Sequence, residues 1–273
     1  MSSDRIQQRF AALAKARRAG LVTFITAGDP SAETGLACMQ ALVRGGADLI
    51  ELGVPFSDPM ADGPTIQRAS ERALAAGMTL TGVLDLVAAF RQQDDTTPVI
   101  LMGYLNPIEN MGYGVFAERA AAAGVDGVLT VDLPPEESGE CRAEFERYGL
   151  RLIYLLAPTS SPARVKAICA QASGFVYYVS VKGVTGGKSF DTEEVRQRIA
   201  EVKAQTRLPV GVGFGVRTPE HAAALAEISD AVIVGSVLIE LVEQHAAAPE
   251  AMVRALETFV VGLRTAMDAR RAA

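Results

Sequence analysis

Residues 21–52 read LVTFITAGDPSAETGLACMQALVRGGADLIEL, and this stretch decides the fold. It begins with a continuous apolar run at 21–26 and continues with a helical pattern at 32–44 that ends at Gly45-Gly46. A second apolar run follows at 48–52. Continuous rather than alternating apolar runs are typical of parallel strands that are covered on both faces. The stretch therefore predicts one strand–helix–strand unit of an α/β protein.

The same unit recurs along the chain. The apolar runs that we predict to be strands span 21–26, 48–52, 98–102, 126–131, 151–155, 175–179, 209–212 and 230–234. Further helical patterns lie between them, at 113–123, 136–148, 162–170, 192–206 and 219–227. Eight such units in about 250 residues favour a (β/α)8 TIM barrel over an open sheet. The long gap after the second run holds two helical patterns, 65–76 and 79–91, and predicts an insertion after strand 2.

The ends of the chain extend this barrel. Residues 2–19 predict an extra N-terminal helix, and residues 249–269 predict a closing helix with an apolar stripe. We find no linker rich in Pro, Gly and Ser that would separate two halves. The sequence therefore predicts a single domain, residues 1–273.

Composition excludes several classes of protein. The 273 residues carry a formal net charge of −6, which does not fit a nucleic-acid-binding surface. No apolar stretch approaches the length that spans a membrane, and the N-terminal segment is too polar for a secretion signal. Cys38, Cys141 and Cys169 show no C-x-x-C spacing and fit buried thiols in a reducing compartment. We expect a cytoplasmic protein without nucleic-acid or membrane partners.

Carboxylates follow the second predicted strand, where TIM barrels carry their reactive groups. Glu51 lies inside an apolar run and is expected to point into the barrel mouth. Burial there would raise its pKa into the range useful for proton transfer. A structural carboxylate that binds a neighbouring loop remains an alternative. Asp58 and Asp62 lie in a loop with Pro and Gly, where Asp58 could shape a turn and Asp62 could cap the helix near Pro64.

Glycines end the last three predicted strands. They occur at 183–187, in Gly211-Val-Gly-Phe-Gly215 and in Gly235-Ser236. Such positions let backbone N–H groups approach an anion, and a helix opening at Ser236 would add its positive end. The pattern predicts a phosphorylated substrate, although glycines that serve only tight turns remain the alternative.

Other chemistries lack the residues they need. His221 and His245 both fall on helical patterns without a ligand-spaced partner, so no metal site is expected. None of the five lysines lies in a predicted strand, which disfavours a Schiff-base aldolase.

The stretch from Glu51 to Gln67, ELGVPFSDPMADGPTIQ, resembles the tryptophan synthase alpha chain family. Supporting stretches lie at 26–30, 102–107, 132–137, 183–186 and 213–215, and the resemblance covers essentially the whole chain. It implies a lyase of tryptophan biosynthesis that cleaves indole-3-glycerol phosphate to indole and glyceraldehyde 3-phosphate by a retro-aldol reaction. Val181-Lys182 departs from what some members carry, which bears on the motion of that loop.

The resemblance also implies roles for individual residues. Glu51 would be the general acid/base at indole C3, and Asp62 would accept the indole N–H. Thr185 would belong to a loop that closes over the site, or be a simple loop residue. The implied substrate-binding residues are Phe24, Ile66, Met102, Leu129 and Tyr177 around the indole and Glu51, and Gly186, Phe214, Gly215, Gly235 and Ser236 on the phosphate side. Phe24, Ile66, Met102 and Leu129 could instead be ordinary core residues.

The family implies a partner as well. Its members form an alpha2-beta2 heterotetramer with a beta chain that holds pyridoxal phosphate, and no cofactor is expected in this chain. Residues 55–62 and 106–110 match the partner-facing loops. Two other functions stay open: another phosphate-substrate barrel enzyme, such as an indole-glycerol-phosphate synthase or a sugar-phosphate isomerase, and a non-catalytic barrel that only activates a partner.

Overall fold

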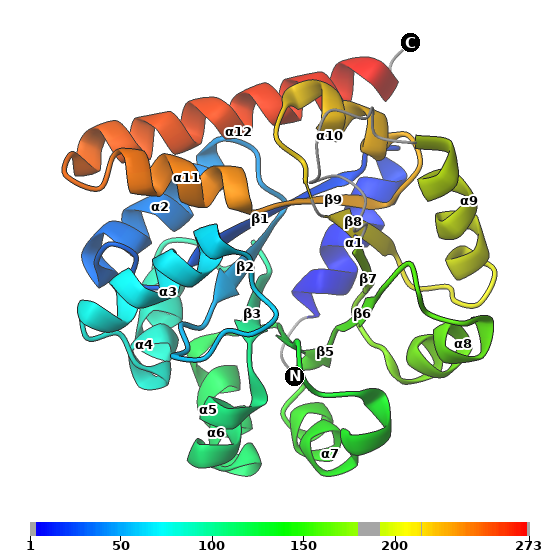
Figure 1. Ribbon diagram of the computed structural model, residues 1–273, viewed down its shortest axis with the longest axis horizontal. Helices are drawn as coiled ribbons and strands as arrows, with labels where there is room; N and C mark the ends of the chain where they lie inside the picture. Colours follow the sequence, from blue (N-terminus) through cyan, green and yellow to red (C-terminus); the bar gives the residue numbers. More distant parts are fainter. Residues whose placement is uncertain (1–3, 180–191, 214, 272–273) are drawn as a thin grey trace.

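The protein is a parallel barrel surrounded by helices (Figure 1). The computed structural model describes residues 4–179, 192–213 and 215–271, so Thr185, Gly186 and Phe214 lie outside the described residues. The strands are β1 (Gly20–Thr26), β2 (Leu49–Gly53), β3 (Val99–Gly103), β4 (Gly127–Thr130), β5 (Arg151–Leu152), β6 (Tyr154–Leu156), β7 (Val176–Val179), β8 (Val210–Gly213) and β9 (Ala231–Val234).

Helices follow the strands in the alternation that the sequence predicts. They are α1 (Arg5–Lys15), α2 (Ala32–Arg44), α3 (Pro64–Ala75), α4 (Leu80–Arg91), α5 (Leu105–Met111), α6 (Tyr113–Ala123), the 3-10 turn η1 (Pro135–Glu137), α7 (Gly139–Arg147), α8 (Pro162–Gln171), α9 (Thr192–Lys203), α10 (Pro219–Ala226), α11 (Ser236–Gln244) and α12 (Pro249–Arg271). The N-terminal helix, the closing helix and the insertion after strand 2, formed by α3 and α4, are confirmed. No single described helix has the length and apolar composition to cross a bilayer, although α3 and α4, bent by 92°, meet those limits together.

The fifth predicted strand is broken, and the break closes the barrel. The strands are hydrogen-bonded in the order β5-β4-β3-β2-β1-β9-β8-β7-β6, so β5 and β6 are neighbours in the chain but occupy the two ends of this order. Ile153 lies between them and donates its N–H to the Val128 carbonyl at 2.9 Å. The single strand expected at 151–155 is therefore wrong. The chain pairs with β4 up to Ile153 and with β7 from Tyr154 onward.

One expected loop is a helix. Residues 106–110 belong to α5 rather than to a loop. Pro107 does not prevent this, because it lies in the first turn, where a helix leaves the backbone N–H groups without intrahelical partners. The carboxylate of Asp132 accepts the Leu105 N–H at 2.9 Å and so satisfies one of those donors.

Helix α1 fills one mouth of the barrel. Its buried face, Ile6, Phe10 and Leu13, packs against inward-facing side chains of the strands, and the rings of Phe10 and Phe175 lie 5.7 Å apart. Burial of such large apolar side chains contributes about 2 kcal/mol each. The plug lies at the N-terminal ends of the strands, since Arg18 and Ala19 lead directly from α1 into β1. The carboxyl ends of the strands are left for a site.

Aspartates tie neighbouring strands together at the plugged mouth. An aspartate precedes β2, β4 and β9, and its carboxylate accepts a backbone N–H from the neighbouring strand that comes before it in the chain. The pairs are Asp48 with Leu21 at 2.9 Å, Asp126 with Val99 at 2.8 Å and Asp230 with Val210 at 2.8 Å. Each bond satisfies a buried donor at the start of a strand, where the ladder is incomplete.

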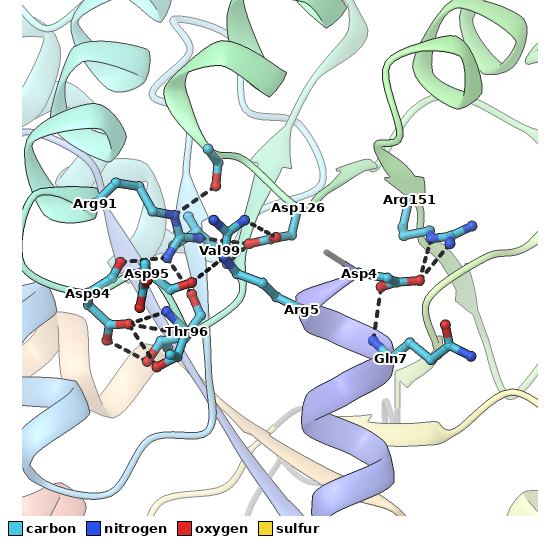
Figure 2. A network of polar contacts seen from close by, with 12 residues as sticks. Asp4, Arg5, Gln7, Arg91, Asp94, Asp95, Thr96, Val99, Asp126 and Arg151 are labelled. Carbon is cyan, nitrogen blue, oxygen red and sulfur yellow. Dashed lines mark hydrogen bonds and ion pairs between the residues drawn. The ribbon is translucent and has the colours of Figure 1, made fainter. Parts of the chain in front are cut away.

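Figure 2 shows the network around Asp126. Arg91, at the end of α4, donates to the Asp126 carboxylate at 2.7 Å and to the carbonyl of Thr97 at 2.7 Å and that of Gly124 at 2.9 Å. Arg5 of α1 donates to the other Asp126 oxygen at 3.0 Å. One buried carboxylate thus links the insertion, the N-terminal plug and two strands.

Replacing Arg91 by Met should lower the free energy of unfolding by about 3 kcal/mol, because it leaves a buried carboxylate and several carbonyls underpartnered. Urea unfolding of the variant measures this loss. Arg119→Met on the exposed face of α6 is the matched control and should change stability little. Equal stability of the two variants would show that the network is dispensable.

Candidate active site

Glu51 is a carboxyl group enclosed in the barrel. The side chains of β2 alternate, so Glu51 shares the inward face with Leu49, which belongs to the interior cluster. Its side chain is 1% exposed, and its Oε1 atom is buried without a hydrogen-bond partner among the described residues. Burial, and to a smaller extent the charge of Asp62, raises the pKa of Glu51 to about 8. The group therefore holds its proton at neutral pH and can donate it.

Asp62 lies in the loop between β2 and α3 and is held by a tyrosine. The Tyr104 hydroxyl donates to Asp62 Oδ2 at 3.1 Å and accepts the Ala61 N–H at 2.9 Å. The side chain of Asp62 does not cap α3, because Gly63 is the N-cap residue and no side-chain bond caps this helix. Burial raises the pKa of the Asp62 carboxyl, and the Tyr104 hydrogen bond opposes that effect. The carboxylate is thus fixed while remaining able to accept a further hydrogen bond.

A narrow cleft opens beside Asp62, at the carboxyl ends of β1 to β4, and Glu51 is buried beneath the residues that line it. Three of the predicted indole-packing residues, Phe24, Ile66 and Met102, line it together with Asp62. Leu129 does not line it: this residue is fully buried in the barrel interior, and Val131, two positions further along, reaches the cleft instead. The cleft has apolar walls and one carboxylate, as a flat aromatic ring with a single N–H requires.

Phe24 connects this cleft to the other half of the barrel mouth. A Cβ atom on Gly53 would lie 2.7 Å from the Phe24 ring, and a Cβ atom on Gly235 would lie 3.4 Å from Phe24. The ring therefore extends across the end of β1, from the end of β2 to the end of β9. Glycine at 53 is needed because any side chain there would displace the ring.

The half of the barrel mouth that contains Gly215 and Gly235 can receive an anion. Gly235 is the N-cap residue of α11, which begins at Ser236 as the sequence predicts and has no side-chain cap. Gly215 adopts φ +74°, a left-handed conformation that favours glycine. A helix N-terminus without a capping side chain favours negative charge through its N–H groups and dipole. Of the residues predicted on the phosphate side, Gly215, Gly235 and Ser236 are described here, and Gly186 and Phe214 are not.

Tyr177 lies between the carboxyl group and the glycines. A Cβ atom on Gly213 would lie 2.5 Å from the Tyr177 hydroxyl, so only glycine leaves room for this ring. Burial, together with the nearby Glu51, raises the pKa of Tyr177 well above its ordinary value. The phenol therefore stays protonated and neutral beside Glu51.

Comparison with known proteins identifies the family. The family model described as tryptophan synthase alpha chain matches residues 10–268. The chain belongs to the tryptophan synthase alpha chain family. It is 57% identical over 265 residues to the tryptophan synthase alpha chain of Burkholderia thailandensis, covering 97% of both chains. It is 55% identical over 266 residues to that of Laribacter hongkongensis, covering 97% of this chain and 100% of the relative.

Solved structures agree with this assignment. The alpha subunit of tryptophan synthase from Legionella pneumophila superimposes with a TM-score of 0.92 at 44% identity, covering 98% of this chain and 99% of the other. A chain of tryptophan synthase from M. tuberculosis, in an aminoacrylate- and BRD0059-bound form, gives a TM-score of 0.86 at 35% identity, covering 96% and 98%. As a member of this family, the chain is an enzyme subunit that cleaves indole-3-glycerol phosphate, and the alternative enzyme families are not supported.

Some residues of the candidate site were missed from the sequence. Tyr104, Thr26 and Val131 line the cleft, although none of them was predicted to bind substrate. All three lie at or just beyond the carboxyl end of a strand, so the rule that drew attention to Glu51 could have found them. Tyr104 also falls within the stretch 102–107 that carries the resemblance.

The raised pKa of Glu51 makes the stability of the protein pH-dependent. Below pH 4.5 the carboxyl is protonated in both states; between pH 4.5 and about 8 the unfolded chain loses the proton while the native state keeps it. The free energy of unfolding therefore falls as pH rises through this window, by up to about 5 kcal/mol.

Glu51→Gln, which cannot titrate, should lack this contribution. Urea unfolding of both proteins at pH 5 and pH 8.5 measures it as the change in their difference, from which the titration of groups that do not interact with Glu51 cancels. We expect the variant to gain stability relative to the parent at the higher pH. A difference that does not change with pH would mean that Glu51 titrates normally in the native state.

Proposed function

We propose that Glu51 starts the cleavage of indole-3-glycerol phosphate by placing a proton on C3 of the indole ring. The bond to be broken joins C3 to the first carbon of the glycerol chain, so its electron pair needs an acceptor. Protonation at C3 creates one, because the ring nitrogen then forms an iminium-like cation. The observation that carries this proposal is the enclosed Glu51 carboxyl, which keeps its proton to a pKa of about 8.

The second half of the step restores the ring. The hydroxyl on the carbon next to C3 loses its proton, that carbon becomes the aldehyde of glyceraldehyde 3-phosphate, and the pair of the broken bond neutralises the cation. One proton enters at C3 and one leaves the hydroxyl, so indole and the aldehyde together contain the atoms of the substrate. Glu51, ionised by its first transfer, is the proposed acceptor of the hydroxyl proton. This route needs no lysine, because the indole nitrogen takes the place of an iminium formed with the protein.

Asp62 is proposed to stabilise the cation. Its carboxylate faces the cleft and would accept the indole N–H, whose positive charge grows as C3 is protonated. The Tyr104 bond at 3.1 Å fixes the direction of the carboxylate beforehand, so little reorganisation is needed when charge develops. Phe24, Ile66 and Met102 would enclose the ring and exclude water.

The phosphate is proposed to bind at the other side of the mouth, at Gly215, Gly235 and Ser236, with Gly186 completing the cradle. Support comes from the uncapped N-terminus of α11 and from Phe24, which a Cβ atom on either Gly53 or Gly235 would meet, so the ring cleft and the glycine-lined end lie side by side. A substrate with an indole at one end and a phosphate at the other would span the two. Leu129, deep in the core, contributes to packing beneath the ring.

The proposed assembly is the alpha2-beta2 heterotetramer, with pyridoxal phosphate in the beta chain and a cytoplasmic location. The support is membership of the family, together with an exposed segment that includes Asp58 and Met60, the latter 81% exposed. A large apolar side chain presented to solvent beside the cleft fits a partner surface.

Release of free indole from indole-3-glycerol phosphate, measured with the purified chain alone and with added beta chain, tests the function. We expect slow indole release alone and faster release with the partner. Formation of an isomer without free indole would contradict the lyase. Stimulation of the beta chain that persists without both Glu51 and Asp62, together with no indole release by the parent chain, would instead indicate a non-catalytic activator.

A further inference from the structure

A second hollow opens at the mouth of the barrel that α1 plugs. It has a volume of about 560 Å³ and lies between the C-terminal end of α1 and the segment that leads into β8. Leu208 and Pro209 precede β8, so this hollow is at the opposite end of the strands from the cleft beside Glu51. Its size is within the range of pockets that hold small organic molecules.

The hollow combines an apolar floor with guanidinium groups. Phe10, Leu13 and Leu208 form apolar surface, and Arg17, Arg18 and Arg207 line the same space. Asp230 is the one carboxylate among the described residues that line it, and both of its oxygens are engaged, by Lys203 at 2.9 Å and by the Val210 N–H at 2.8 Å. The carboxylate therefore does not neutralise the arginines.

Two of the three guanidinium groups have no hydrogen-bond or ion-pair partner among the described residues. Arg18 forms a two-bond pair with Asp268, each bond 3.0 Å long. The guanidinium groups of Arg17 and Arg207 make no hydrogen bond or ion pair with any described residue. Both residues are exposed. Two guanidinium groups without partners, next to apolar side chains, are suited to a carboxylate attached to a flat ring. Each guanidinium can donate two hydrogen bonds to the carboxylate, or stack on the face of the ring.

The backbone of Arg17 is held in an unfavourable conformation. Its φ is +53°, and it is the only described residue other than glycine with a positive φ. Arg17 N–H bonds to the Ala14 carbonyl at 3.0 Å and Arg18 N–H to the Leu13 carbonyl at 2.9 Å, the two bonds of a Schellman motif. Its left-handed position is usually occupied by glycine. An arginine at this position makes the backbone less stable than glycine would, and its side chain lines the hollow.

We propose that this hollow is a binding site for a small aromatic carboxylate, separate from the site that cleaves indole-3-glycerol phosphate. The carboxylate lies between Arg17 and Arg207, and the ring lies against Phe10 and Leu208. The site is independent of the proposed catalytic roles of Glu51 and Asp62.

Titration calorimetry of the full-length chain with 2-naphthoate tests the site, in the presence of saturating glycerol 3-phosphate and indole to occupy the opposite mouth. Uncharged 2-naphthamide is the matched ligand. We expect 2-naphthoate to bind at one site, and Arg17→Gly and Arg207→Gln each to weaken it by roughly 10-fold or more. Arg119→Gln, which removes the same charge from the exposed face of α6, should leave the affinity unchanged.

The glycine variant separates binding from folding. Arg17→Gly relieves the left-handed strain, so its melting temperature should be equal to or above that of the parent while 2-naphthoate binding is weakened. The proposal is overturned if 2-naphthoate does not bind, if the amide binds equally well, or if Arg17→Gly and Arg207→Gln bind it like the parent. None of these outcomes depends on indole release, so failure here leaves the proposed lyase function untouched.

Discussion

Glu51→Gln should reduce the rate of indole release by at least about 10³-fold, the largest effect we expect from any single substitution. Glutamine keeps the shape of the side chain and its place in the barrel but cannot give a proton to C3. The loss should appear in kcat, because the group acts on the reacting atoms and contributes little to holding the substrate. Steady-state release of indole from indole-3-glycerol phosphate measures it.

Glu118→Gln on the exposed face of α6 is the matched control and should retain the parent rate. Near-normal turnover by the Glu51 variant would refute its role as proton donor. A loss confined to KM would also contradict the account, since it would make Glu51 a binding residue.

Asp62→Asn is expected to lower kcat by about 10²-fold. The asparagine can still accept the Tyr104 hydrogen bond, so the loop is expected to keep its place, but the negative charge that stabilises the iminium-like ring is gone. Indole release by the isolated chain measures the effect, and urea unfolding should show that stability is retained.

Asp58→Asn provides the comparison within the same loop. Asp58 is exposed, and its carboxylate accepts a hydrogen bond from the Ser57 hydroxyl at 2.5 Å, so this change should leave indole release by the isolated chain unaltered. Equal losses for Asp58→Asn and Asp62→Asn would indicate a general disturbance of the loop rather than a charge acting on the ring.

The barrel could be predicted because its strands are enclosed on both faces. Runs such as 21–26 and 230–234 contain few polar residues, and each is followed by a helical pattern at a spacing that parallel strands require. The break at Ile153 could not be predicted, because it depends on which neighbours the segment pairs with and not on its own residues. Helix α5 was missed for a similar reason, since Asp132, which satisfies its first N–H, is distant in sequence.

Residues of the candidate site could be predicted where their polarity differs from that of the neighbouring sequence. Glu51 stands out as a charge within an apolar run, whereas Tyr104 and Thr26 do not conflict with a strand end and became visible only in the cleft. Leu129, which the resemblance places at the indole, is fully buried and does not line the cleft, so its contact with substrate stays a prediction. A shift of one position along a strand moves a side chain to the other face of the sheet. A shift of two positions keeps the face but moves the side chain nearer to or further from the mouth of the barrel, and the sequence alone does not resolve this.

The proposed mechanism requires the Glu51 carboxyl inside the barrel to carry a proton at neutral pH. Infrared difference spectra between the parent chain and Glu51→Gln, recorded from pH 4 to pH 10, isolate the protonated carboxyl band of this residue. The account predicts that the band persists through neutrality and is lost with a midpoint near pH 8. A midpoint near pH 4.5, with the band absent at pH 7, would contradict it.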